Sequence, residues 1–337
     1  MADIEPRVAL VMGDAAGVGI ELAAKLLADE ASKAARLLVI GDADLLAVGA
    51  KTAGVTLNVP VVADLRDARP EPGRPVLFNP GHQNATAIPP GTPTVESGAF
   101  AMRNFGTALK LAKEGAIDAI CFTPFNKAAL KLAGNPYLDE IHWAAEQLEF
   151  RGRCSEYNRL DNLWNARVTS HVPMKQVPAL LQKDEVLEAI RDADKTLRQA
   201  GTAKPRLAVA GYNPHAGEGG LFGREEIDEI APAVEAAKRE GIDVDGPFPS
   251  DTVWLRAKRG DFDAVVTMYH DQGQIALKLL GFNRGVTILG GMPVPICTPA
   301  HGTAYDIVGK GIADLGATLA AFRTAVAMAT SRARAAA

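Results

Sequence analysis

Short apolar runs alternate with amphipathic segments along most of this chain. In the N-terminal third, residues 8–12 and 37–40 are typical of buried strands, and residues 20–27 between them are typical of a helix after a glycine-bearing turn. A helical pattern over 97–113 leads into a further strand at 119–122. Strands that alternate with helices predict βαβ units and a mostly parallel sheet.

The same alternation returns in the middle of the chain. The runs 167–170, 206–210 and 264–268 are apolar or β-branched, which predicts three more strands. The segments near 176–200 and 224–240 are charged on one face and apolar on the other, which predicts helices.

Two stretches lack this alternation, and the whole chain is long enough for two lobes. Residues 66–95 are rich in Pro, Gly and Asn and predict an irregular excursion, while 313–337 predict an alanine-rich helix. We expect an α/β fold of two lobes with mostly parallel sheets flanked by helices. Residues 1–128 plus 296–337 form the first lobe of this prediction, and 129–295 form the second.

Composition excludes several classes of protein. The formal charge of -4 gives no basic surface for nucleic acid. No apolar run reaches membrane-spanning length, and the first residues lack the features of a signal peptide. Three widely spaced cysteines do not suggest a disulfide framework, so we expect a cytoplasmic protein.

Three of the six histidines follow predicted strands. His171, His215 and His270 come after the runs 168–170, 207–210 and 265–269. Ligands of open α/β sheets bind beyond the carboxyl ends of the strands, and three imidazoles with an open position form a catalytic metal site. The alternative is that each is an ordinary hydrogen-bonded core or loop histidine.

Two aspartates and two lysines lie near these histidines in the sequence or in polar loops. Asp271 adjoins His270, and either Asp271 or Asp251 could orient a ligand histidine or bind substrate. Asp251 could instead cap a helix over 252–258. Lys278 is a candidate for proton transfer, since a partly desolvated lysine near a metal has a lowered pKa; Lys127 is a weaker candidate, and either can be an exposed helix lysine.

Glycine-rich loops supply the candidate cofactor contacts. The turn at 13–19 joins a strand to a helix, where anions often bind, but it matches no phosphate-binding fingerprint and can be a tight packing turn. Residues 213–220 place backbone N–H groups around a histidine and a glutamate. A third loop could lie against the adenosine half of a nucleotide and contains His301, Gly302, Thr303 and Ala304.

Several motifs together resemble the 4-hydroxythreonine-4-phosphate dehydrogenase family, nearly end to end and in the same order. These motifs are MGDAAGVGIE (12–21), TPFNK (123–127), SHVP (170–173), NPHAGEGGLFGREEID (213–228), GPFPSDT (246–252), YHDQG (269–273) and HGTAYDIVGKG (301–311). The last motif is also similar to one in isocitrate and isopropylmalate dehydrogenases, whose fold the family shares.

The resemblance implies a homodimeric NAD- or NADP-dependent enzyme with its metal site at the subunit interface, on the second lobe. His171, His215 and His270 would bind a divalent metal, zinc above all or else manganese, cobalt or nickel. A secondary hydroxyl would be oxidised, and the resulting β-keto acid would lose carbon dioxide. Lys278 matches the substrate lysine of the family, and Asp251 and Asp271 match its acidic contacts.

Three departures fall where the family holds the phosphorylated end of its substrate. The His-Thr-Glu motif is here His142-Trp143-Ala144, the expected asparagine is Thr287, and the expected arginine aligns with Ile296. Loss of the arginine removes a bidentate anion clamp. We therefore expect a small hydroxy-acid substrate without a phosphate, still with contacts from His142, Trp143, Lys278, Thr287 and Ile296.

Other functions remain open on sequence alone. Within the family, the substrate could be terephthalate cis-dihydrodiol, whose ring would suit Trp143, or 4-phosphooxy-threonine itself. A non-catalytic protein that binds metal or hydroxy acids on the same scaffold is a second class, and a metal-dependent hydrolase or aldolase is a third. The hydrolase would leave the loop at 301–311 unexplained.

Overall fold

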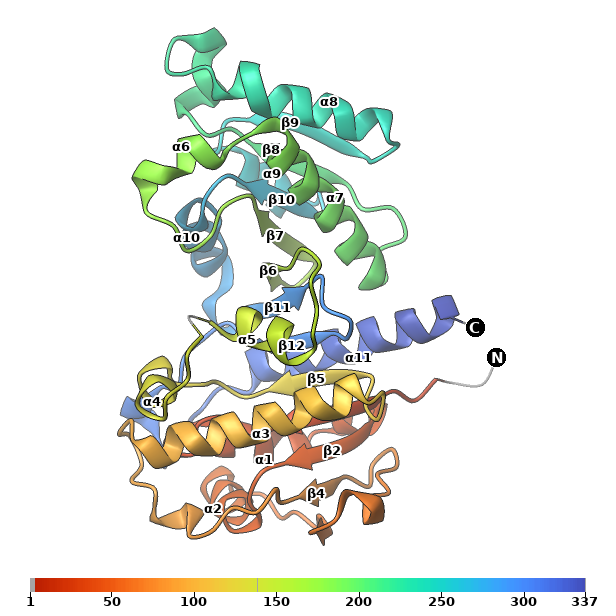
Figure 1. The fold of residues 1–337 in the computed structure, drawn as a ribbon, viewed down its shortest axis with the longest axis vertical. Helices are drawn as coiled ribbons and strands as arrows, with labels where there is room; N and C mark the ends of the chain where they lie inside the picture. The colour runs from red at the N-terminus through yellow and green to blue at the C-terminus, as the bar shows by residue number, and fades with distance from the viewer. Residues whose placement is uncertain (1–3, 138, 337) are drawn as a thin grey trace. The chain divides into compact units, whose positions relative to one another are not determined.

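The computed structural model describes residues 4–137 and 139–336 (Figure 1). By its internal contacts the chain forms two compact units, Met1–Cys154 with Val286–Ala337, and Ser155–Gly285. In the described part of the chain, none of the helices combines the length and the apolar character that a membrane span requires.

The boundaries of these units differ from those expected at residues 128 and 295. Helix α5 (Glu140–Gln147) joins the first unit because it buries Ile141 and Trp143 in the core of that unit. Strand β11 (Val286–Gly290) joins it because it pairs antiparallel with β12 (Ile296–Pro299).

The first unit is built on a sheet with the strand order β3-β4-β2-β1-β5-β12-β11, parallel except at β11. Its remaining strands are β1 (Arg7–Val11), β2 (Arg36–Ile40), β3 (Val61–Val62), β4 (Val76–Phe78) and β5 (Ala119–Phe122). Its remaining helices are α1 (Gly19–Ala28), α2 (Ala43–Ala53), α3 (Val95–Lys113), α4 (Lys127–Leu132) and α11 (Gly316–Ala336). Figure 1 shows α3 in front of this sheet and α11 behind it.

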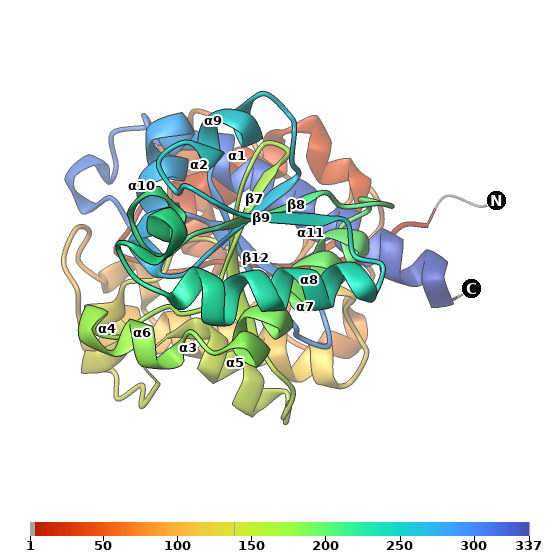
Figure 2. The same cartoon turned by 90° about the horizontal axis from the view of Figure 1, so that it is seen from above.

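The second unit has the strand order β6-β7-β10-β8-β9, parallel except where β6 pairs with β7. Its strands are β6 (Ser155–Leu160), β7 (Leu163–Arg167), β8 (Leu207–Ala210), β9 (Val244–Phe248) and β10 (Ala264–Thr267). Its helices are α6 (Val177–Leu180), α7 (Lys183–Gln199), α8 (Ala231–Arg239), α9 (Val253–Lys258) and α10 (His270–Gly281). Figure 2 shows α7 and α8 on one side of β8 and β9, and α9 on the other.

The mostly parallel α/β class is confirmed, and so are most of the expected elements. The strand expected at 167–170 is wrong, because β7 spans Leu163–Arg167. Asn165 lies inside that strand, fully buried, and its Nδ2 donates to Val265 O and Thr267 Oγ1, each at 3.0 Å. A buried polar residue with hydrogen bonds to the neighbouring strand interrupts the apolar pattern without interrupting the strand.

Candidate active site

The three candidate histidines follow three adjacent strands of the second unit. β10 lies between β7 and β8 and is parallel to both, so the carboxyl ends of the three strands meet at one edge. His171 follows β7, His215 follows β8, and His270 is the first residue of α10, after β10. The expected placement at the strand ends is therefore what the structure shows.

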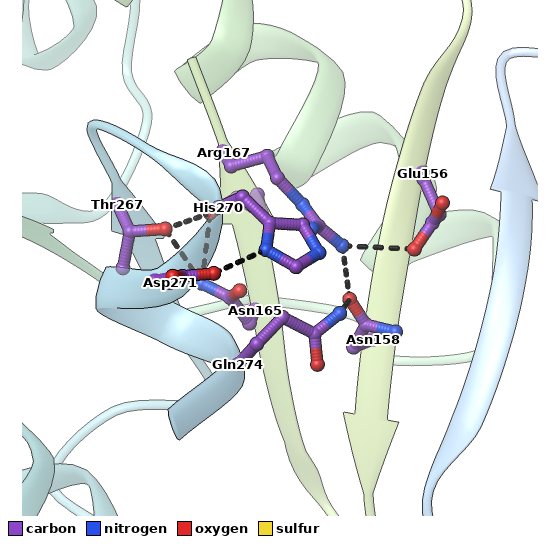
Figure 3. A network of polar contacts seen from close by, with 9 residues as sticks. Glu156, Asn158, Asn165, Arg167, Thr267, His270, Asp271 and Gln274 are labelled. Atoms are coloured by element: carbon purple, nitrogen blue, oxygen red, sulfur yellow. Dashed lines mark hydrogen bonds and ion pairs between the residues drawn. The ribbon is translucent and has the colours of Figure 1, made fainter. Parts of the chain in front are cut away.

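The imidazole rings of two of these histidines lie close together. The ring centroids of His171 and His270 are 5.5 Å apart, with their planes inclined by 41°. Nδ1 of His270 is 2.7 Å from Oδ1 of Asp271, which accepts its hydrogen bond (Figure 3). This contact holds the ring through one nitrogen and leaves Nε2 for another partner.

His215 lies in an unusual backbone segment, Pro214–Gly220. Six successive residues from His215 to Gly220 have positive φ, including the non-glycine residues His215 (54°), Ala216 (53°) and Glu218 (44°). Each such residue costs about 1 kcal/mol or more, so surrounding contacts must hold the segment. Within the described residues, no group of three His, Cys, Asp or Glu side chains is arranged to hold a metal ion.

A buried carboxylate fixes the backbone that leads into this segment. Glu226 is 3% exposed, and its Oε1 accepts hydrogen bonds from the N–H groups of Tyr212 and Asn213, both at 2.7 Å. Its Oε2 accepts a third hydrogen bond, from Nδ2 of Asn213, at 2.9 Å. Charge-assisted bonds of this kind are stronger than neutral ones, so Glu226 anchors the entrance to the histidine segment.

A buried polar network lies close to His270 (Figure 3). Arg167, the last residue of β7, is 4% exposed and its Nη2 donates to Glu156 Oε1 at 3.0 Å and to Asn158 Oδ1. Its Nε and Nη1 have no hydrogen-bond partner within the described residues. Desolvation lowers the pKa of this guanidinium, against the opposing charge of Glu156.

The other candidate catalytic residues are exposed. Asp251 does not cap a helix: α9 begins at Val253, and its N-cap residue is Thr252, whose side chain makes no capping bond. Lys278 lies in α10, eight residues after His270, which is about 12 Å along the helix axis. Within one chain the two side chains therefore leave the helix from different turns.

The candidate substrate residues lie in the first unit, apart from Lys278, and two of them are in its core. Trp143 is 4% exposed and packs edge-on against Phe105, with ring centroids 5.0 Å apart. Ile296 is fully buried and pairs with Ile120 of β5. Neither side chain presents a surface to a substrate, because apolar neighbours cover both.

His142 and Thr287 are more accessible. His142 is exposed on α5, with its Nδ1 2.5 Å from Oδ1 of Asp139. Thr287 is half-buried in β11, opposite Thr298 of β12. These two positions stay candidates for substrate contacts.

The candidate cofactor loop packs against the first glycine-rich turn, in the first unit. The N–H of Val18 donates to Thr303 O at 3.0 Å, and a Cβ on Gly17 would lie 2.8 Å from Cβ of Thr303. Asp14, 1% exposed, accepts a hydrogen bond from the hydroxyl of Tyr305, and its burial raises the pKa of its carboxyl group. Close packing thus explains Gly17.

Within the candidate loop itself, the residues differ in accessibility. Gly302 is exposed with open space around its Cα, and His301 is half-buried with its Nδ1 2.9 Å from the Gly302 carbonyl. Thr303 is buried, and Ala304 takes a left-handed conformation with φ 45°. The exposed His301-Gly302 edge is the part of this loop that a ligand can reach.

A cavity of about 670 Å³ also belongs to the first unit, lined by the excursion 81–89 and the start of α3. His82 packs against Phe100 there, with ring centroids 4.2 Å apart and planes inclined by 33°, and its Nε2 lies 2.6 Å from Oδ1 of Asn104. Burial lowers the pKa of His82. Sequence patterns gave no indication of this cavity, because the excursion has no periodicity.

Comparisons with known proteins place this arrangement in a family. The sequence profile described as pyridoxal phosphate biosynthetic protein PdxA matches residues 33–325. A Rhizobium meliloti protein provisionally named 4-hydroxythreonine-4-phosphate dehydrogenase 2 is 51% identical over 330 residues, covering 97% of this chain and 94% of that protein. The D-threonate 4-phosphate dehydrogenase of Cupriavidus necator is 40% identical, covering 99% of this chain and 100% of that protein.

Solved structures agree with the sequence comparison. The crystal structure of a 4-hydroxythreonine-4-phosphate dehydrogenase from Burkholderia phymatum superposes with a TM-score of 0.80 at 38% identity, covering 96% of this chain and 98% of that chain. The chain therefore belongs to the PdxA family, the 4-hydroxythreonine-4-phosphate dehydrogenase family that its motifs resemble, and it is an oxidoreductase that acts on a CH–OH group.

Proposed function

We propose that this chain is a metal-dependent, NAD(P)-linked dehydrogenase that oxidises the secondary hydroxyl of a small hydroxy acid, after which the β-keto acid loses carbon dioxide. The observation that carries the proposal is the pair His171 and His270, with ring centroids 5.5 Å apart at the ends of adjacent parallel strands. Family membership supports the dehydrogenase chemistry.

The histidine pair fits a transition metal, with zinc our first choice. Two imidazoles that bind one zinc ion at about 2.0–2.1 Å in a tetrahedral site have ring centroids about 5 Å apart. Asp271 holds Nδ1 of His270, so Nε2 is the nitrogen that would bind the ion. Manganese, cobalt and nickel suit the same donors, and His215 is the third ligand of the proposal.

When bound, the cation would act as a Lewis acid that stabilises negative charge on the substrate oxygen, and the nicotinamide would accept a hydride. The residues of the chain supply orientation and protons. Asp271 fixes the ring of His270, and Asp251 is the proposed contact for a polar group of the substrate. Lys278, exposed on α10, is the proposed acid and base: it takes the hydroxyl proton and returns a proton to carbon after the carboxylate leaves as carbon dioxide.

The cofactor site of the proposal is in the first unit, at His301, Gly302, Thr303 and Ala304. The accessible His301-Gly302 edge supports it, since open backbone allows a nucleotide to approach closely. Both NAD and NADP stay in the proposal. No disulfide joins the three cysteines of the described residues, which supports the reducing cytoplasm we propose as the location.

We further propose a substrate without a phosphate. Two positions expected to hold the phosphorylated end, Trp143 and Ile296, are buried and apolar, so neither supplies a cation. Burial of Trp143 also removes the reason to favour terephthalate cis-dihydrodiol, because the indole offers no face to an aromatic ring. Because relatives are named for 4-phosphate substrates, the unphosphorylated hydroxy acids must be tested against their 4-phosphates.

The proposed assembly is a homodimer with the metal site at the subunit interface. Ile275 and Leu279 are 60% and 84% exposed on α10, one helical turn apart and beside Lys278. Adjacent exposed apolar side chains on one helix face are typical of a contact surface. A partner would then complete the site around the histidine pair.

Two experiments test these proposals. Steady-state rates with NAD or NADP should favour 4-hydroxythreonine and D-threonate over their 4-phosphates; efficient turnover of either phosphate alone would contradict the unphosphorylated substrate. For the dimer, we would mix the inactive variants His171→Ala and Lys278→Ala. If the partner's Lys278 completes each site, half of the dimers are mixed and each of these has one intact site of two, so the mixture regains about one quarter of wild-type activity. No recovery would contradict a site that is shared between the two chains.

A further inference from the structure

We infer that Gln272 is a positioning residue that fixes the segment of His215 relative to the pair His171 and His270. The inference rests on the proposed function, because it concerns the metal ligands named there. Gln272 lies in α10, two residues after His270, and its side chain is half-buried. Its side chain makes one hydrogen bond to the turn that precedes α10 and a second to the loop after β8.

The first link joins the segments of His171 and His270 at the peptide group of Met268. The carbonyl of Met268 accepts hydrogen bonds from Thr169, from Oγ1 at 2.8 Å and from the backbone N–H at 3.2 Å. Thr169 precedes His171 by two residues, and Met268 precedes His270 by two. Both Met268 and Thr169 are buried, so this link is shielded from water.

The second link adds the segment of His215. Oε1 of Gln272 accepts a hydrogen bond from the N–H of Met268 at 2.7 Å, and its Nε2 donates to the carbonyl of Gly211 at 2.8 Å. Gly211 is the first residue after β8 and leads through Tyr212 and Asn213 to His215. One side chain therefore joins the turn before His270 to the loop that carries His215.

The bond to Gly211 matters because the following segment is strained. Besides its own turn bonds, such as the one from the N–H of Ala216 to Asn213 O at 3.1 Å, the left-handed backbone from His215 to Gly220 is fixed at its entrance. The contacts there are Glu226 on residues 212 and 213 and the two hydrogen bonds of Gly211. The second bond of Gly211 runs from its N–H to Phe248 O at 2.7 Å. Without Gln272, a buried carbonyl and a buried N–H lose their partners, and the loop shifts to satisfy them.

Two substitutions separate the two links. Gln272→Leu removes both hydrogen bonds at similar volume. Gln272→Glu keeps an acceptor for the N–H of Met268 but has no donor for the carbonyl of Gly211, so it breaks the link to the His215 segment alone. The matched control is Gln274→Glu in the same helix, whose Nε2 donates to Asn158 Oδ1 of β6 at 2.7 Å, outside the three histidine segments.

The test measures zinc affinity by competition with a chromophoric chelator, together with the visible spectrum of the cobalt-substituted protein. Loss of a contact that orients metal ligands weakens metal binding by about 10–100-fold, so we expect this loss in both Gln272 variants and a changed cobalt spectrum. Gln274→Glu should bind zinc like the wild type. The free energy of urea unfolding of each apoprotein shows whether a weaker zinc affinity comes from an unstable fold or from misplaced ligands.

The outcomes are distinct. Wild-type zinc affinity and an unchanged cobalt spectrum in Gln272→Glu would overturn the inference and leave the proposed function intact. Failure of the wild-type protein to bind zinc or cobalt would instead overturn the proposed function. If Gln272→Leu does not fold, Gln272→Glu alone decides.

Discussion

Oδ1 of Asp271 accepts a hydrogen bond from Nδ1 of His270 at 2.7 Å. The two residues are neighbours at the N-terminus of α10, where the helix dipole favours a negative charge. This bond selects the nitrogen of His270 that stays available and fixes the direction of the ring toward His171. An exposed aspartate thus acquires a defined structural role.

Removal of Asp271 should weaken metal binding without loss of the fold. Asp271→Ala should reduce zinc affinity by about 10–100-fold, and Asp271→Asn should have a smaller effect because its amide oxygen still accepts the bond. Chelator competition measures both. Asp251→Asn is the matched control, for which we expect unchanged zinc affinity and a raised KM. Equal zinc affinity in all three variants would contradict the orienting role.

Gly273→Ala should be destabilising for a local steric reason. A Cβ at this position would lie 2.0 Å from Oδ1 of Asn165, inside the buried strand β7. We expect a loss of about 1–3 kcal/mol in the free energy of unfolding, measured with urea. Gly106→Ala, in the middle of α3 with nothing within 4 Å of its Cβ, should instead stabilise by about 0.5–1 kcal/mol. Similar effects of the two substitutions would be inconsistent with this packing.

Trp143 should affect stability more than substrate binding. Trp143→Ala should cost about 3–5 kcal/mol in unfolding free energy, since it empties a buried aromatic site. Trp143→Phe should keep most of the packing against Phe105 and leave KM unchanged. A large change of KM in Trp143→Phe, with stability preserved, would contradict this prediction and indicate that Trp143 contacts the substrate.

His82 should make the first unit sensitive to mild acid. Burial lowers the pKa of its imidazole below the ordinary 6.5, so the unfolded chain takes up a proton before the folded chain does. This contribution to stability is complete above pH 6.5 and is lost as the pH falls from 6.5 through the lowered pKa. The slope is less than about 1.4 kcal/mol per pH unit. Over this range, the free energy of urea unfolding should depend less on pH in His82→Gln than in the wild type. Equal pH dependence of the two proteins would contradict this contribution of His82.

Sequence alone predicted the α/β class and the placement of the three histidines, because both follow from local patterns. Parallel strands bring their carboxyl ends together whatever the register, so His171, His215 and His270 could be assigned to one edge. The bounds and pairing of β7 were not predictable. The polar Asn165 interrupts the apolar pattern of this strand, and its hydrogen bonds to Val265 and Thr267 form only once β10 lies beside β7.

Alignment with a family also does not reveal burial. Trp143 and Ile296 occupy positions where substrate contacts were expected, yet both pack in the apolar core. Conversely, Gln272 was visible within YHDQG but had no assigned role, because its two partners come from two different loops. Contacts between distant segments carry this information, and no local pattern contains it.

The most direct test of the proposed function follows nicotinamide reduction with a hydroxy-acid substrate before and after metal removal. We expect the chelated protein to be inactive, zinc to restore activity, and His270→Ala to stay inactive at the zinc concentration that restores the wild type. Full activity of the chelated wild type, or of His270→Ala, would contradict a metal-dependent reaction at the pair His171 and His270.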